Sequence, residues 1–288
     1  MAITSGLSER ELTPDDISSA LALSEEAGWN QTARDWQLML HNGRGFGIES
    51  KKGQLVATAL TLPHGNQLAW ISMVLIAGSF RKQGLATHLL NTCIDFLSSQ
   101  SIIPLLDATE AGRMVYNKIG FKPLYGIQRM FRQKNCPLPS FDQQPVTIRS
   151  ITEPDLTAIL SLDREIFGAD RSAVLHHLYS RQPSCTYLAM QNSKICGYIM
   201  AREGNHAFHS GPIVAPDVET ACHLVTRALE LIEGPVYIDA MDLHGDFQSW
   251  LREVGFVRQR SFTRMVLGDL PEFDQPALIY ASVGPELG

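Results

Sequence analysis

The stretch from 69 to 97 constrains the fold of this 288-residue chain more than any other. It begins with Ala-Trp-Ile-Ser-Met-Val-Leu-Ile at 69–76, and a short loop separates this run from 85–97, where apolar residues recur every three or four positions. A short continuous apolar run is typical of a buried strand, and the second pattern is typical of an amphipathic helix. We therefore expect a buried strand, a tight loop and a long helix, in this order.

The loop between the strand and the helix has the features of an anion site. Gly84 and Ala86 leave the backbone bare where the helix begins, so unpaired N–H groups and the positive end of the helix dipole point outward. Arg81 and Lys82 add positive charge at its rim. The loop matches neither G-x-x-x-x-G-K-[ST] nor G-x-G-x-x-G, which excludes two common nucleotide-binding loops. A strand-turn-helix that binds no ligand remains an alternative.

Two motifs resemble those of the GNAT acetyltransferase superfamily. The string Arg81-x-x-Gly84-x-Ala86 is similar to the acyl-CoA signature [QR]-x-x-G-x-[GA], and the stretch from Leu106 to Phe121, with Val115-Tyr116 and Ile119-Gly120-Phe121, resembles the motif that closes this fold. The elements expected over 5–133 follow the order β-α-α-β-β-β-α-β-α-β that the resemblance implies. The expected fold class is therefore α/β (α+β), with a mixed, mostly antiparallel central sheet flanked by helices.

The resemblance implies acetyl-CoA as a cosubstrate, no metal, and direct transfer of the acetyl group to an amine. Where the central strand separates from its neighbour, its backbone would bind the pantetheine and polarise the thioester carbonyl. The glycine loop would bind the pyrophosphate. The residues assigned to acetyl-CoA in this way are Val74, Leu75, Ile76, Arg81, Lys82, Gln83, Gly84, Leu85, Ala86 and Thr87, with Thr109 where the family often has Asn.

The same resemblance suggests catalytic and acceptor-binding residues. Tyr116 would protonate the departing thiolate, although a helix tyrosine can also be a packing residue. Asp107, at a strand end beside the cleft, is the first candidate for the base, with Glu49 and His64 behind it; an Asp there can instead cap a turn. The candidates for holding the acceptor are Trp29, Asn30, Asp35 and Trp36, of which Trp36 is equally compatible with the core.

The second half of the chain repeats the first. Arg10, Thr13 and Asp16 recur as Arg149, Thr152 and Asp155, and Gly120-Phe121 recurs as Gly255-Phe256. An internal repeat of domain length indicates duplication. The second copy has no Arg-x-x-Gly-x-Ala loop, and Leu251 stands where the first copy has Tyr116.

We therefore predict two tandem GNAT folds. A catalytic domain would span 1–134, a polar, proline-punctuated linker would span 135–145, and a GNAT-like domain without the acyl-CoA loop would span 146–288. The apolar tail at 277–284 is expected to pack as an extra strand.

Composition narrows the function further. The net charge of −6 argues against nucleic acid as a partner, no run approaches the length of a membrane span, and five scattered cysteines indicate reduced thiols in the cytoplasm. The histidines and cysteines lack the spacing of a metal site. We expect a monomeric or homodimeric N-acetyltransferase that acts on a primary amine of a small molecule. The alternative is a non-catalytic protein that binds CoA as a sensor or scaffold.

Overall fold

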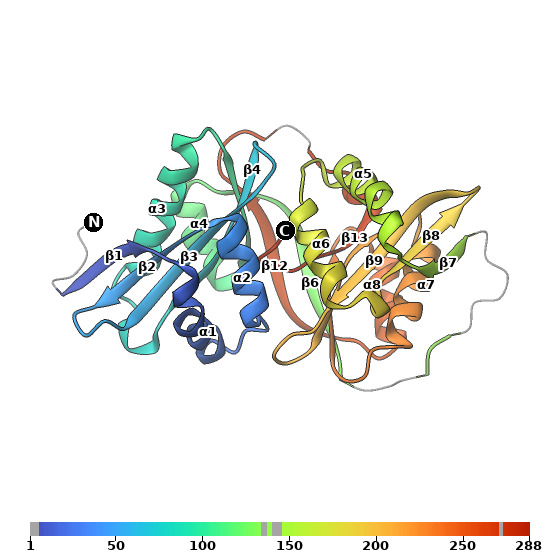
Figure 1. Ribbon diagram of the computed structural model, residues 1–288, viewed down its shortest axis with the longest axis horizontal. Coiled ribbons are helices and arrows are strands. Elements are labelled where there is room, and N and C mark those ends of the chain that lie inside the picture. The colour runs from blue at the N-terminus through green and yellow to red at the C-terminus, as the bar shows by residue number, and fades with distance from the viewer. Residues whose placement is uncertain (1–5, 134–136, 140–145, 271–272) are drawn as a thin grey trace.

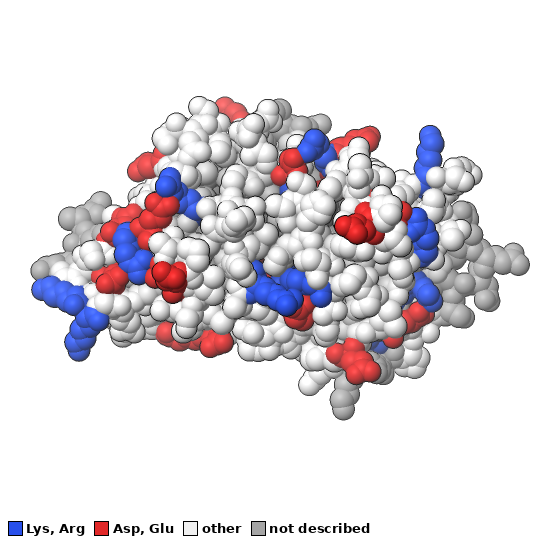
Figure 2. All heavy atoms as spheres, viewed as in Figure 1, with Lys and Arg blue, Asp and Glu red and all other residues white. Residues whose placement is uncertain are grey.

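The computed structural model describes residues 6–133, 137–139, 146–270 and 273–288. Within these residues thirteen strands form one continuous sheet, and the helices form two groups, one for each half of the chain (Figure 1). No helix in these segments has the length and apolar character needed to cross a membrane. On the face seen in Figure 2, acidic and basic side chains are interspersed and most of the surface is uncharged.

The first half has the element order that the sequence predicts. Its elements are β1 (Leu7–Glu11), α1 (Ile17–Glu26), α2 (Ala33–Asn42), β2 (Arg44–Ser50), β3 (Leu55–His64), β4 (Leu68–Ile76), α3 (Leu85–Ser99), β5 (Ile103–Thr109), α4 (Glu110–Ile119) and β6 (Lys122–Arg132). Local chemistry sets several of the boundaries. Thr13 and Asp16 form a capping box before α1, and Gly53, with φ of +76°, turns the chain between β2 and β3.

The second half repeats this order and adds one strand. Its elements are β7 (Thr147–Ser150), α5 (Leu156–Phe167), α6 (Ser172–Arg181), β8 (Tyr187–Gln191), β9 (Lys194–Arg202), β10 (Phe208–Val214), α7 (Val218–Leu229), β11 (Val236–Met241), α8 (Gly245–Glu253), β12 (Val257–Val266) and β13 (Ile279–Ser282). The capping box recurs at Thr152 and Asp155. Most of the predicted linker, at 135–136 and 140–145, lies outside the described residues.

The two halves exchange their last strands. The strand order is β1-β2-β3-β4-β5-β12-β6-β11-β13-β10-β9-β8-β7, so β12 of the second half lies between β5 and β6 of the first, and β6 pairs with β11 of the second. Only β4–β5 and β10–β11 pair in parallel; the other pairings between these strands are antiparallel. The mixed, mostly antiparallel sheet of the prediction is therefore confirmed, but the exchange is a feature that the repeat does not predict.

Matching ion pairs tie the exchanged strands together. Arg264 on β12 donates two hydrogen bonds of 2.8 Å to Asp107 on β5, and Arg129 on β6 donates two of 2.7 Å to Asp239 on β11. All four side chains are buried. Because Arg129 and Arg264 occupy the same place in the two copies of the repeat, the junction has an approximate two-fold symmetry.

Each copy has a gap where its two parallel strands diverge, and the two gaps differ. In the first half β4 and β5 pair over three residues, from Leu68 with Ile103 to Trp70 with Leu105, and beyond these residues they diverge. In the second half β10 and β11 also diverge, but β13 fills the gap: Ala281 pairs with Ile213 on one side and with Ala240 on the other. The prediction that the tail packs as an extra strand is confirmed, and its place in the sheet closes the cleft of the second copy.

Candidate active site

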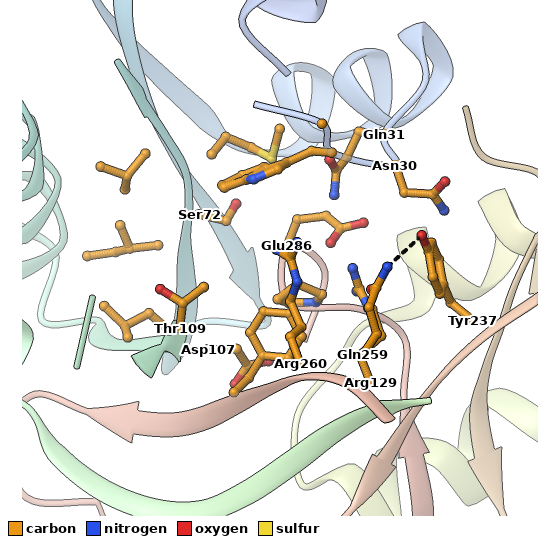
Figure 3. Close-up of a pocket in the computed structure, with 18 of the residues that line it drawn as sticks. Asn30, Gln31, Ser72, Asp107, Thr109, Arg129, Tyr237, Gln259, Arg260 and Glu286 are labelled. Atoms are coloured by element: carbon orange, nitrogen blue, oxygen red, sulfur yellow. Dashed lines mark hydrogen bonds between the residues drawn. The ribbon is translucent and has the colours of Figure 1, made fainter. Parts of the chain in front are cut away.

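A cavity of about 160 Å³ lies where β4 and β5 diverge (Figure 3). The first half contributes the loop before α2, the segment Ile71–Val74 of β4, the end of β5, and Tyr116 of α4. The second half contributes residues of β11, β12 and the tail after β13. The site is therefore shared between the two copies, although the acyl-CoA motifs belong to the first alone.

The segment of β4 beside the cavity has an unusual backbone. Met73 adopts a left-handed conformation, with φ of +52°, at a bulge in the pairing with β3. The Thr58 hydroxyl donates a hydrogen bond of 2.8 Å to the Met73 carbonyl oxygen. From Ile71 onward, β4 has no strand partner on its β5 side among the described residues. The backbone at Val74 thus has no strand partner toward the gap. The Ile76 carbonyl accepts a hydrogen bond of 3.2 Å from Arg81, and the Leu75 side chain points into the core.

The glycine loop presents a bare helix N-terminus. Gly84, with φ of +80°, precedes α3, and no side chain caps the first turn of this helix. Arg81, Lys82, Gln83, Gly84 and Thr87 are exposed, Ala86 is half-buried and Leu85 is buried. Among the described residues, no side chain accepts a hydrogen bond from the first amides of α3, which is the arrangement that binds phosphate groups.

The second copy lacks this feature for a physical reason. At the start of α7, which follows β10 as α3 follows β4, the Asp217 carboxylate accepts a hydrogen bond of 2.8 Å from the Thr220 amide. A carboxylate of the chain itself thus occupies the positive end of this helix. In the second copy, therefore, the helix N-terminus is capped and β13 fills the gap between β10 and β11.

Tyr116 lies on the cavity wall. Its ring packs over Gly112, where an added Cβ atom would come within 2.9 Å of the ring, and beside Phe121, with 6.0 Å between ring centroids. Its hydroxyl forms no hydrogen bond with any described residue, and burial raises the pKa of this phenol. The group stays protonated at neutral pH and is available to donate. Thr109 also lines the cavity, but its hydroxyl accepts the Gly112 amide as the cap of α4.

The position of Asp107 argues against its predicted role as the base. Both carboxylate oxygens accept hydrogen bonds from Arg264, and the side chain is fully buried. Asp239 makes the same contact in the copy that has no acyl-CoA features, so the pair belongs to the strand exchange. The sequence could not show this because Arg264 lies far away along the chain.

Asp107 does line the cavity, whereas the two further candidates for the base lie outside it. Glu49 accepts a hydrogen bond of 2.6 Å from Arg10, beside β1, and does not line the cavity. His64 is buried against Trp70 and Phe167, with ring centroids 5.1 and 5.6 Å away. Desolvation lowers the pKa of His64 to about 3, so it is neutral and part of the core between the halves.

The predicted acceptor-binding residues fall into two groups. Trp29 and Asn30 line the cavity, and Asn30 is fixed by the second half, because its amide donates to the Ala207 carbonyl and accepts from the amides of His206 and Ala207. Asp35 and Trp36 do not line it. Trp36 is fully buried and donates to the Ser24 hydroxyl, and Asp35 is buried in ion pairs with arginines of the second half.

Several cavity residues were missed by the sequence analysis. They are Gln31, Ser72, Arg129, Tyr237, Gln259, Arg260, Phe262 and Glu286. Most of them reach the cavity only because of the strand exchange and the insertion of the tail. Both depend on contacts between distant parts of the chain, which no local pattern records.

Two family models match the chain, one in each half. The model of the acetyltransferase (GNAT) family matches residues 13–121, and that of an acetyltransferase (GNAT) domain matches residues 159–281. The two matched regions follow the duplication.

Similar proteins extend over nearly the whole chain. YitH of Bacillus subtilis (strain 168), an uncharacterized N-acetyltransferase, is 28% identical over 253 residues, which are 85% of this chain and 86% of YitH. Holothin acyltransferase of Pseudoalteromonas sp. (strain SANK 73390) is 22% identical over 271 residues, which are 93% of this chain and 89% of that protein. The solved structure of a candidate acetyltransferase from Pyrococcus horikoshii has a TM-score of 0.81 at 18% identity and covers 100% of this chain and 98% of that one. The fold is thus shared over the full length.

Proposed function

Because this chain belongs to the GNAT acetyltransferase family and carries two such domains in tandem, we propose that it transfers an acetyl group from acetyl-CoA to a primary amine of a small molecule. The amine attacks the thioester directly while both substrates are bound at the cleft of the first domain. One observation carries the proposal: the first copy has an open gap and an uncapped helix N-terminus, and the second copy has neither.

The residues present fit acetyl-CoA at the first copy. The bare amides before and within the first turn of α3, with Arg81 and Lys82 beside them, would hold the pyrophosphate. The open backbone of β4 from Met73 to Ile76 would bond the pantetheine, and its N–H groups would stabilise negative charge on the thioester oxygen. Acetyl-CoA supplies the activated acyl group, and the chain supplies position and hydrogen bonds.

Tyr116 would act as the general acid. As the amine forms its bond to the acetyl carbon, the carbon–sulfur bond breaks and the electron pair stays on sulfur. The phenol, which keeps its proton because burial raises its pKa, would then protonate the thiolate. The amine must also lose a proton. Because Arg264 binds both oxygens of Asp107, this proton would pass to solvent water at the cavity.

The test is acetyl-CoA binding by isothermal titration calorimetry. We expect one molecule bound per chain, with at least a 100-fold loss of affinity in Gly84→Asp, because this substitution adds both a negative charge and strain at φ of +80°. Gly53→Asp is the matched control, since Gly53 is also exposed with φ of +76° but lies in the β2–β3 turn. Two molecules per chain, or unchanged binding in Gly84→Asp, would contradict the assignment.

Turnover distinguishes the enzyme from a CoA sensor or scaffold. An enzyme releases free CoA thiol from acetyl-CoA when a panel of primary amines is added, and the acetylated product gains 42 Da as expected for one acetyl group replacing one hydrogen. A sensor binds CoA tightly with no turnover on any amine. Since one relative is named an N-acetyltransferase and another an acyltransferase, longer acyl-CoA donors belong in the same screen.

A further inference from the structure

We propose, on the basis of the function above, that Glu286 binds the acceptor as its ammonium form, which then loses one proton to water before it attacks, and that the acceptor is a small cationic amine with an apolar tail. Glu286 follows β13, the strand that closes the cleft of the second copy. The tail that fills one cleft therefore delivers an acidic side chain to the other.

The placement of Glu286 supports a ligand-binding role. The side chain lines the cavity, as Figure 3 shows, although Glu286 is only 2% exposed. Its Oε1 atom accepts a hydrogen bond from Arg202, which fixes the carboxylate, whereas Oε2 has no hydrogen-bond partner in the described part of the chain. A buried carboxylate oxygen without a partner is costly, so a donor from a ligand would stabilise it.

Two more unpartnered oxygen atoms belong to residues of the same cavity. They are Oε1 of Gln31 and Oγ of Ser72, on side chains of residues that are 4% and 7% exposed. An amide oxygen and a carboxylate oxygen can only accept, and a hydroxyl can accept as well as donate. A primary ammonium group offers three N–H donors, so its chemistry matches this set better than that of a carboxylate or phosphate.

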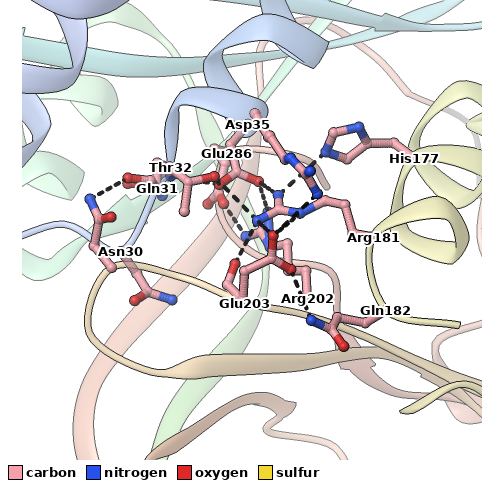
Figure 4. Close-up of polar contacts among 12 residues, drawn as sticks. Asn30, Gln31, Thr32, Asp35, His177, Arg181, Gln182, Arg202, Glu203 and Glu286 are labelled. Atoms are coloured by element: carbon pink, nitrogen blue, oxygen red, sulfur yellow. Dashed lines mark hydrogen bonds and ion pairs between the residues drawn. The ribbon is translucent and has the colours of Figure 1, made fainter. Parts of the chain in front are cut away.

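The charge of the surrounding network also favours a cation. Arg181 and Arg202 are buried against three carboxylates, those of Asp35, Glu203 and Glu286 (Figure 4), which leaves one negative charge unbalanced. Arg34 lies 3.7 Å from Glu203, but its side chain is 63% exposed and contributes little. A cation at the free oxygen of Glu286 would offset this surplus, which solvent screens in part because the Glu203 side chain is 34% exposed.

The other charges at the cavity do not reverse this balance. Arg129 is neutralised by Asp239 through two hydrogen bonds, and Arg260 is exposed, so its charge is screened by solvent. The rest of the wall is largely aromatic or apolar, with Trp29, Tyr237 and Phe262 among its members. This combination fits an ammonium head on an aromatic or alkyl tail.

The first experiment measures steady-state kinetics with 2-phenylethylamine and simple alkylamines as probes. In Glu286→Gln the amide can still accept from Arg202 but cannot balance an ammonium, so KM for the amine should rise at least 30-fold while KM for acetyl-CoA stays within 2-fold. Glu286→Asp keeps the charge, so its KM for the amine should lie between those of the wild type and Glu286→Gln. Glu233→Gln, at an exposed position, is the matched control and should match the wild type.

Unchanged KM for the amine in Glu286→Gln would overturn the inference and leave the proposed function intact. No acetylation of any amine, with acetyl-CoA still bound, would instead contradict the proposed function.

A second measurement needs no variant and tests the inference if Glu286→Gln fails to fold. N,N-dimethyl-2-phenylethylamine is a cation that cannot accept a stable acetyl group, and 2-phenylethanol is its uncharged counterpart. The wild type should bind the cation at least 10-fold more tightly in calorimetry at pH 7. Equal binding of the two compounds would overturn the proposal.

Discussion

At the residue scale, the Tyr116 hydroxyl is the group on which the proposed chemistry depends most directly. Tyr116→Phe keeps the ring that packs on Gly112 and Phe121 but removes the proton donor. We expect kcat to fall by about 10- to 100-fold, with KM for acetyl-CoA nearly unchanged, because the hydroxyl acts when the thiolate departs. Tyr179→Phe, on α6 and outside the cavity, is the control. Equal kcat in Tyr116→Phe and the wild type would rule out this role.

Buried histidines make the folded state sensitive to acid. Desolvation lowers the pKa of His64 to about 3 and those of His177 and His209 to about 4, from an ordinary value of 6.5. Between pH 6.5 and these values the unfolded chain binds more protons than the folded one. The contribution of these histidines to the free energy of unfolding is therefore fully present above pH 6.5 and is lost as the pH is lowered.

His64→Gln tests this at one position. Glutamine does not take up the proton that His64 binds on unfolding below pH 6.5. The fall in the free energy of unfolding between pH 7 and pH 5 should therefore be about 2 kcal/mol smaller in the variant than in the wild type. Urea unfolding at the two pH values measures it. His41→Gln, at an exposed histidine, should keep the full pH dependence of the wild type. If His64→Gln also keeps the full pH dependence of the wild type, His64 is not held neutral in the folded state.

Local motifs located some of the candidate residues but could not show the contacts of others, for a physical reason. The loop at 81–87 and Tyr116 could be located because each belongs to a local motif that places a backbone or a helix face. Asp107 and Asp35 were given roles that their contacts do not favour, because partners such as Arg264 and Arg181 are invisible in the local sequence. Trp36, for which the core was an equal alternative, is fully buried. Glu286 was not predicted, since nothing around it indicates where the tail leads.

At the scale of elements, β13 links the stability of the second copy to acceptor binding in the first. Ala281 is fully buried and paired on both sides. Ala281→Pro removes a strand hydrogen bond and should lower the free energy of unfolding by roughly 3 kcal/mol, measured by chemical denaturation. The variant should also bind the amine probes more weakly, because Glu286 loses its support.

The same variant should not gain a second acyl-CoA site. Asp217 still caps α7, so calorimetry should again give one acetyl-CoA per chain. The exposed Ala277→Pro provides a control outside the strand. A second bound acetyl-CoA in Ala281→Pro would show that β13 alone, and not the helix cap, closes the second copy.

Periodicity and turn signals predicted the order of elements in the first half. The capping box at Thr13, the turn at Gly53 and the glycine loop at Gly84 each depend on a few neighbouring residues, and signals of this kind can be recognised in a local stretch of sequence. The position of β12 between β5 and β6 could not, because an alternating strand has the same pattern whichever neighbour it pairs with.

At the scale of the whole molecule, neither half has a complete sheet of its own. One hydrophobic core contains residues of both halves, and β5 of the first half is covered by β12 of the second. Residues 1–134 produced alone should therefore be insoluble or unfolded by circular dichroism. Coexpression with 146–288 should restore a folded, acetyl-CoA-binding complex.

The control for this experiment is the full chain with a protease site introduced at 140–145 and cut after folding. The two pieces should stay associated in size-exclusion chromatography, because the exchanged strands and the paired arginines hold them together. A soluble, folded fragment 1–134 that binds acetyl-CoA alone would show that the exchange is dispensable, and the boundaries 1–134 and 146–288 would then mark independent domains.

The exchange of β6 and β12 also dictates when this protein can fold during its synthesis. β5 ends at Thr109 and its neighbour β12 begins only at Val257, so a ribosome adding 5 to 20 residues per second leaves the edge of β5 waiting on the order of ten seconds. An unpaired edge of that kind can recruit strands from other nascent chains. Slow translation of the second half should therefore lower the yield of native protein, and chaperones that shield exposed strand edges should recover it.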